Sequence, residues 1–211
     1  MTALHIPDPA ERADLGAFTA RVVRLEQAAL VRLRVTGDRV VTWATTPFDV
    51  LATRLVHGTL DVGDVTVPAK GLLTALAVDR LATVDPGRAT GVWPGELPPD
   101  GGWVAVEEVP AAELEALTER GLAVARESAG ALGPPASLLD QTVLTVREQA
   151  CGPMVKVPLR CLFALSGMGF LGEDTDADPV RVSATGSWLR LDARFGAVVR
   201  RRLTALPLVV V

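Results

Sequence analysis

The spacing of apolar and polar residues predicts a helix near the start of the chain. Apolar residues recur there at intervals of three and four, which is the period of one helix face: Leu15, Phe18, Val22 and Leu25. Asp8 can cap this helix, and Pro9 suits its first turn. We therefore expect a helix over residues 8–27.

A period of two follows and predicts strands. Residues 29–36 and 39–45 alternate on either side of Gly37-Asp38, which indicates a hairpin. Further strands are expected at 49–57 and 64–67, and Pro68 then opens a helix that ends near residue 81. The stretch 85–102 is rich in Gly and Pro and predicts a loop before a strand at 103–106.

The second part of the chain begins with another predicted helix, from Ala111 to about Ala129. The remaining expectations are strands at 141–149 and 154–157, a helix opened by Pro158, an acidic loop at 173–179, strands at 180–185, 188–193 and 197–203, and a terminal strand at 206–211.

This order of elements repeats. The best local match is VTVPAKGLLTA at 65–75 against VKVPLRCLFAL at 155–165. The pattern predicts an α+β fold of two similar halves, each running helix, antiparallel strands, helix, strands, with domains at 1–108 and 109–211. Two unrelated α+β halves remain the alternative.

Residues 28–76, from AALVRLRVTGDRVVTW to the VTVPAK strand end and its apolar helix, resemble a domain of the bacterial DNA sliding clamp. The resemblance implies two similar domains with helices on one side of curved sheets, and no catalytic residues. Clamps encircle DNA with basic helices, because binding grows with the phosphates neutralised. The predicted helix at 111–129 is acidic instead, with four Glu against two Arg, so encirclement of DNA is not expected.

Composition limits the source, the compartment and the chemistry. The 211 residues carry a net charge of −4, with 19 Arg, two Lys, no Asn and no Tyr, which is typical of a GC-rich bacterial genome. The Arg excess therefore does not by itself indicate phosphate binding. Residues 1–10 lack the pattern of a signal peptide, and no apolar run approaches the roughly 20 residues of a membrane span. We expect a cytoplasmic protein with Cys151 and Cys161 reduced.

No motif for catalysis, metal or cofactor is complete. The glycine pattern at 167–172 lacks the helix that a dinucleotide site needs, and the acidic run at 174–178 lacks the later ligands of a calcium loop. Cys151 and Cys161 match no zinc spacing, and whether Cys151 is reactive stays open. We therefore predict no catalytic residues, no metal and no cofactor.

Two groups of residues are candidates for binding. Arg194, Arg200 and Arg202 form the one basic cluster, on a strand that we expect to be exposed or at a sheet edge, and they could hold an anion. The candidates for a protein interface are two tryptophans beside the loop and two residues of the apolar tail: Trp93, Trp103, Leu208 and Val210.

The sequence favours a non-enzymatic protein that acts through protein contacts as a homodimer, with no membrane and no nucleic-acid partner. One alternative is a binding protein or enzyme for a small anionic molecule, with its site in the cleft between the domains. Another is a nucleic-acid-associated protein with a clamp-like fold.

Overall fold

The computed structural model describes residues 2–79, 81–128, 130, 134–147, 154–172 and 178–202. The helices are α1 (Pro9–Leu25), α2 (Ala69–Asp79), α3 (Ala111–Glu127), α4 (Ala136–Leu139) and α5 (Leu159–Gly167). The strands are β1 (Leu4–His5), β2 (Leu30–Thr36), β3 (Arg39–Thr45), β4 (Leu51–His57), β5 (Thr59–Leu60), β6 (Asp64–Pro68), β7 (Thr83–Val84), β8 (Val104–Val109), β9 (Thr142–Arg147), β10 (Met154–Pro158), β11 (Val180–Ala184), β12 (Trp188–Ala193) and β13 (Gly196–Arg201).

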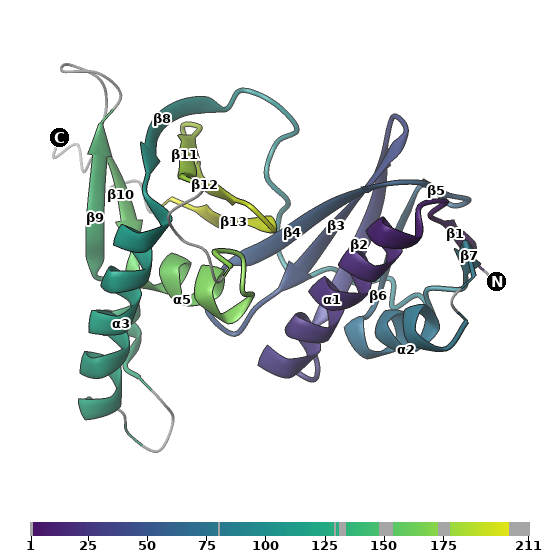
Figure 1. Cartoon of the computed structure of the whole chain (residues 1–211), viewed down its shortest axis with the longest axis horizontal. Helices are drawn as coiled ribbons and strands as arrows, with labels where there is room; N and C mark the ends of the chain where they lie inside the picture. The colour runs from purple at the N-terminus through teal and green to yellow at the C-terminus, as the bar shows by residue number, and fades with distance from the viewer. Residues whose placement is uncertain are drawn as a thin grey trace, which may run out of the picture.

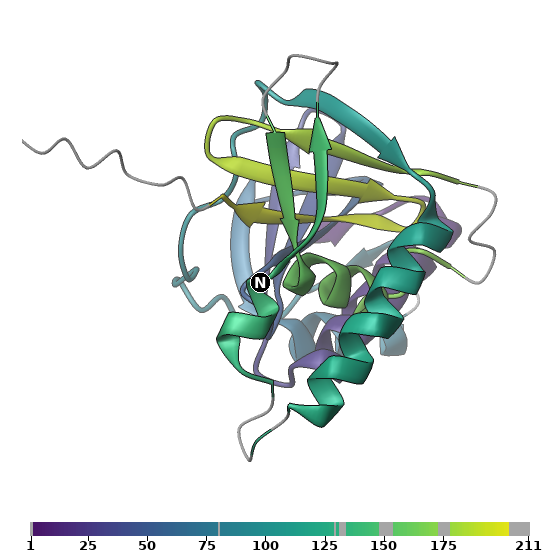
Figure 2. The same ribbon diagram turned by 90° about the vertical axis from the view of Figure 1, so that its left-hand side faces the viewer.

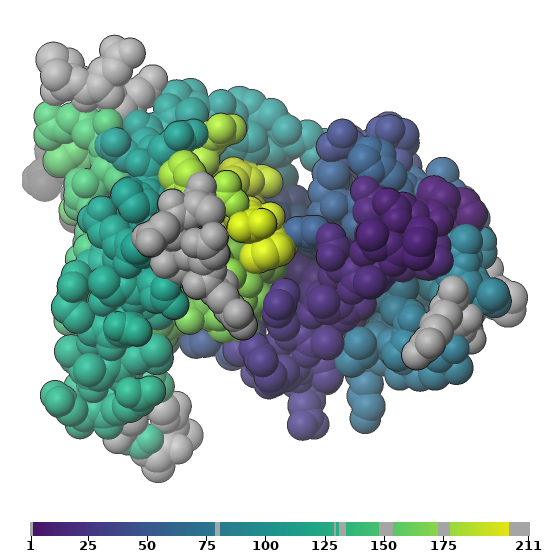
Figure 3. Space-filling model, viewed as in Figure 1, coloured from purple at the N-terminus to yellow at the C-terminus, as the bar shows by residue number. Residues whose placement is uncertain are grey.

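One eight-stranded sheet runs through both halves of the chain, in the order β6-β2-β3-β4-β13-β12-β11-β8. Its first four strands come from the N-terminal half and its last four from the C-terminal half (Figure 1). The helices α1 and α2 pack together beside the first four strands, while α5 lies against β13 and α3 packs on α5. The space-filling view shows the two halves as lobes that touch along the middle (Figure 3).

The first helix and hairpin form where the periodicity predicts them. The Asp8 carboxylate accepts a hydrogen bond from the Ala10 amide at 2.8 Å, and the predicted apolar face of α1 is buried. Gly37 turns the β2–β3 hairpin with a φ of 63°, a conformation that glycine adopts without steric cost.

The two halves share a common unit, which confirms the predicted α+β fold of two similar halves. In the first half β2 pairs with β6, which leads into α2, and in the second half β9 pairs with β10, which leads into α5. Both ladders are antiparallel, and the matched Val-x-Val-Pro segments occupy the same place in them. Likewise β1 pairs with β7, and β8 pairs with β11.

Each half also has strands that the other lacks. The first half inserts β3 and β4 between β2 and β6, and the second half adds β12 and β13 after β11. These additions meet in the centre of the sheet, where β4 pairs with β13. Among the described strands, the pairing that joins the halves therefore occurs once, because neither half carries both of its strands.

The predicted division into residues 1–108 and 109–211 stays a prediction. The predicted boundary falls inside strand β8, and this strand pairs with β11 of the second half. The acidic loop at 173–179 lies mostly outside the described residues, and the terminal strand expected at 206–211 lies wholly outside them.

None of the described helices combines the length and the apolar character needed to cross a membrane.

Gly196 holds the β12–β13 hairpin close to the N-terminal half. A Cβ atom on Gly196 would lie 2.6 Å from the Phe170 ring and 2.9 Å from the carbonyl oxygen of Thr53. We expect Gly196→Ala to lower the free energy of unfolding by about 2 kcal/mol, because the Thr53 backbone cannot yield without breaking the sheet. Urea denaturation measures the change.

The control is Gly186→Ala, because a Cβ atom at Gly186 has no described neighbour within 4 Å. Equal stability of the two variants would show that the hairpin tolerates a wider spacing from β4.

Candidate functional site at the junction of the two halves

The junction is a short ladder that depends on side chains for support. Strands β4 and β13 pair over three positions only, which join Leu51 to Val199, Ala52 to Val198 and Thr53 to Ala197. Because side chains alternate along a strand, Val198 and Arg200 face the helices, whereas Val199 and Arg201 face the opposite side of the sheet. The two faces of the junction therefore carry different chemistry.

On the helix side, two arginine side chains are buried together. The Arg160 and Arg200 side chains are 8% and 11% exposed. Both reach the same carboxylate oxygen of Asp140, at 2.8 Å and 3.1 Å. The Asp49 carboxylate lies 3.7 Å from Arg160 and 3.4 Å from Arg200. Two guanidinium groups thus share two carboxylates, which offsets their charge at this buried place.

The N-terminal half reaches this cluster through the loop before β4. Arg160 donates a 2.7 Å hydrogen bond to the carbonyl oxygen of Phe48, whose ring packs edge-on against Phe163 of α5. The next residue, Asp49, has a φ of 55°, a left-handed conformation in which an Asp is one of the few tolerated residues. The loop is thus shaped to present both the Phe48 carbonyl and the Asp49 carboxylate to the C-terminal half.

Cys161 lies near the arginine pair and is expected to have low reactivity. Its thiol is fully buried, and desolvation raises its pKa to about 12, although the charges of Arg200 and Arg160 oppose the shift. A thiol with so high a pKa stays protonated at neutral pH and is a poor nucleophile. Cys161 is therefore a residue of the hydrophobic core.

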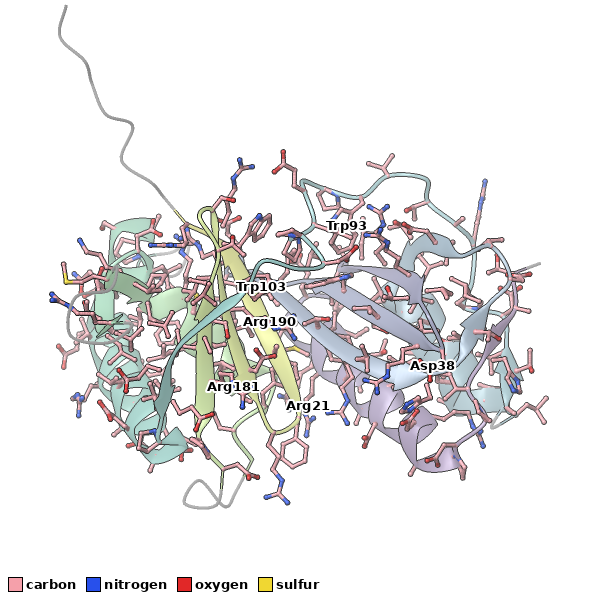
Figure 4. All side chains as sticks on the ribbon, turned by 90° about the horizontal axis from the view of Figure 1, so that it is seen from above. Arg21, Asp38, Trp93, Trp103, Arg181 and Arg190 are labelled. Carbon is pink, nitrogen blue, oxygen red and sulfur yellow. The ribbon has the colours of Figure 1, made fainter. Side chains whose placement is uncertain are left out.

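The opposite face of the junction is covered by the segment between the halves, residues 85–103, which we call the strap. Trp43, Trp188 and Val199 form an apolar cluster on the sheet there, against which Trp93, Leu97 and Trp103 pack. Figure 4 shows Trp93 and Trp103 above the place where the strands of the two halves meet. The strap therefore crosses the junction and covers its tryptophans.

The three predicted ligand arginines do not converge. Arg200 faces the helices in the buried cluster, Arg202 donates to the Thr185 carbonyl oxygen at 2.9 Å, and Arg194 lies 3.4 Å from Asp178. Their role in ligand binding stays a prediction.

The expectation that their strand is exposed or at an edge is wrong. Strand β13 lies between β4 and β12 near the middle of the sheet. It can lie there because Asp49 and Asp140, which are distant in sequence, supply the opposite charge for Arg200.

Of the predicted interface residues, Trp93 and Trp103 are partly buried within the strap, and Leu208 and Val210 lie outside the described residues. The interface role of all four stays a prediction. Sequence reasoning missed Asp49, Asp140 and Arg160. One signal was available for Arg160, which is the single charged residue in the apolar run LRCLFALS.

Comparison with known families divides the chain near the strap. A model described as a domain of unknown function, DUF8185, matches residues 98–205. The chain belongs to the DUF8185 family. A second model, also described as a domain of unknown function, DUF8010, matches residues 1–95 of this DUF8185 protein. No curated protein matches the chain.

Solved structures with a similar fold are bacterial sliding clamps. The DNA polymerase sliding clamp from Caulobacter crescentus is 18% identical, with a TM-score of 0.61 over 98% of this chain and 67% of the clamp. The sliding clamp from Bacillus subtilis is 12% identical, with a TM-score of 0.61 over 98% of this chain and 65% of the clamp. The DNA polymerase III subunit beta from Pseudomonas aeruginosa is 14% identical, with a TM-score of 0.59 over 98% and 66%.

The chain thus spans about two thirds of the length of these clamps. The predicted resemblance to a sliding clamp is confirmed at the level of the fold.

The shared carboxylate of Asp140 predicts a large effect on stability. We expect Asp140→Ala to lower the free energy of unfolding by about 2–3 kcal/mol, because two buried guanidinium groups lose their closest partner. Urea denaturation monitored by tryptophan fluorescence measures this loss. The control is Glu108→Ala, which breaks the exposed pair with Arg181 and should cost less than about 1 kcal/mol. Similar losses in both variants would contradict a special role for the cluster.

The raised pKa of Cys161 predicts how the protein responds to alkali. In a Cys151→Ser variant, a thiol reagent should leave Cys161 unmodified at pH 8 and react fully in denaturant. The thiol ordinarily has a pKa of 9.0, so unfolding releases its proton above that pH, and the folded state should lose stability as the pH rises from 9.0 toward about 12.

The absence of Tyr and the presence of only two Lys leave few other groups that titrate in this range. Cys161→Ala should flatten the alkaline loss of unfolding free energy, and an unchanged slope would contradict the assignment.

Proposed function

We propose that the chain is a non-enzymatic scaffold that acts through protein contacts and pairs with a second copy of itself along β9. The observation that carries this proposal is an open strand edge. In the first half β2 is paired on both sides, with β6 and β3, whereas among the described residues β9 is paired with β10 alone. Among the described residues of the second half, no hydrogen-bonded strand fills the place that β3 takes in the first, and we call this place the vacancy.

Residue-by-residue correspondence supports the vacancy. Val67 and Val157 match in the repeat, and they pair with Val31 and Leu144. Val31 is fully buried, but Leu144 is only partly buried. A neighbouring strand at this edge would complete its burial. Figure 2 shows β9 and β10 as a separate two-stranded ribbon beside the large sheet.

The sequence of β9 suits a strand partner. It reads TVLTVR and has no Pro or internal charge of the kind that protects exposed edges. A two-fold axis at Thr145 would place Leu144 of one copy opposite Val146 of the partner copy, on the same face of the extended sheet. The strand is thus self-complementary in the register that keeps its apolar residues together, and strand addition is a common mode of recognition.

Charge supports protein contacts over encirclement of nucleic acid. The four long helices α1, α2, α3 and α5 carry seven basic and seven acidic residues between them. A helical surface without net positive charge gains little from phosphate neutralisation. Among the described strands, the junction of β4 with β13 occurs once, and it joins the two halves within a single copy.

A cysteine cross-link tests the β9 contact. In a Cys151→Ser background, we expect Thr145→Cys to form a disulfide-linked dimer under mild oxidation, because the proposed axis brings the two Thr145 positions face to face. Non-reducing gel electrophoresis and light scattering measure the product.

The matched control is Thr36→Cys in the same background, since Thr36 is exposed on a strand that is paired on both sides. A chain that stays monomeric by light scattering at about 100 µM, a concentration at which a contact with a micromolar dissociation constant is populated, would overturn the proposal. Equal cross-linking of both variants would overturn it as well.

A further inference from the structure

The structure contains a cleft on the strap side of the junction, where the strands of the two halves separate. The ladder between β4 and β13 ends at Thr53 and Ala197, where the β12–β13 hairpin turns, and a cavity of about 400 Å³ lies beside this end. The N-terminal half contributes residues of β2, β3 and β4, the C-terminal half contributes the β12–β13 hairpin, and the strap contributes Pro99, Asp100 and Trp103. A cavity of this size lies within the range of small-molecule sites.

The cleft is rich in arginine, and each of its arginines has an acidic partner: Asp100, Asp14, Asp192 and Asp178. The acidic residues in the lining are Asp100 and Asp192. Four arginines also line the cleft, two from each half: Arg34, Arg54, Arg190 and Arg194. The whole chain carries a net charge of −4. The frequency of Arg in the composition does not explain this gathering, since the four side chains come from separate strands and from the hairpin turn. Guanidinium groups in the lining of a cleft suit an oxyanion ligand.

Two of these arginines are available to a ligand. Arg34 lies 3.6 Å from Asp100, and the side chains are 42% and 71% exposed, so this ion pair is weak and an incoming anion can replace it. Arg194 pairs with Asp178 at 3.4 Å in a similarly exposed contact.

Arg54 is already held by an acidic residue of α1. Its terminal nitrogen bonds to the Asp14 carboxylate, and its Nε is buried away from the open space of the cleft. Arg54 therefore lines the cleft without being one of the arginines that a ligand would engage first.

The cleft also has aromatic walls. Trp43 and Trp103 both line it, and the Arg190 guanidinium lies 5.9 Å from the centre of the Trp103 ring. Figure 4 shows Trp103 and Arg190 next to each other between the strands of the two halves. Indole rings offer flat apolar surfaces on which a planar ring can stack. Because Trp43 is only 8% exposed, the partly exposed Trp103 is the aromatic residue of the lining that a ligand can reach.

We propose that this cleft binds a phosphate monoester that carries a planar ring, which is the chemistry of a nucleoside monophosphate. Arg34 and Arg194, one from each half, hold the phosphate, and Trp103 contacts the ring. Of the arginines singled out in the sequence, Arg194 is the one that lines the cleft. The site does not depend on the β9 contact, since no residue of β9 lines it.

Titration with adenosine 5′-monophosphate tests the site, with tryptophan fluorescence and calorimetry as readouts. We expect saturable binding with a dissociation constant below about 1 mM, and at least about fivefold weaker binding of ribose 5-phosphate, which lacks the ring. The double variant Arg34→Gln/Arg194→Gln should weaken binding at least about tenfold. Added salt should weaken it too.

The matched control is Arg39→Gln/Arg181→Gln, which removes the same charge from exposed positions outside the cleft and should bind as the unmodified protein does. The proposal would be overturned if adenosine 5′-monophosphate gave no saturable signal up to about 5 mM, which is about five times the expected upper limit of the dissociation constant. Equal weakening by both double variants, equal binding of ribose 5-phosphate, or binding of a single-stranded oligonucleotide without binding of the nucleotide would also overturn it.

Discussion

The joining of the two halves depends on the charge balance between Arg160, Arg200, Asp49 and Asp140. Three ladder pairs between β4 and β13 are too few to fix the position of one half against the other. The two buried guanidinium groups must each keep an acidic partner, because a buried charge without its partner is strongly unfavourable. The observed register of β4 on β13 places the loop that carries Asp49 against Arg160 of α5 and Arg200 of β13.

Local structure could be predicted from the sequence, whereas the contacts between the halves could not. Periods of 3.6 and 2 report which face of an element is apolar, and they place α1, the β2–β3 hairpin and the repeated strand–helix units correctly. They do not report which strand lies beside which. Arg200 illustrates the difference, since a charged residue on a strand indicates an edge unless its partners are known. Those partners are Asp49 and Asp140, about 150 and 60 residues away in the chain.

The likeness to sliding clamps and the departures from it have separate physical causes. Buried apolar positions on strands and helices determine the fold, and these can persist while identity falls to 12–18%. The charges on the exposed helix faces are not constrained by packing, and here they balance. The chain thus has a clamp-like backbone, but its helices carry no net positive charge. The architecture is therefore present without the basic surface that phosphate binding requires.

Strand β13 shows how one segment serves both faces of the junction. Arg200 points toward the helices and supports the join, whereas its neighbours in the alternation, Val199 and Arg201, face the strap. The ladder ends at Ala197 because the hairpin turns at Gly196, where Phe170 and the Thr53 carbonyl leave no room for a side chain. The same close packing that ends the ladder opens the cleft beside it. The charged cluster and the cleft are therefore two consequences of one short strand pairing, on opposite sides of the sheet.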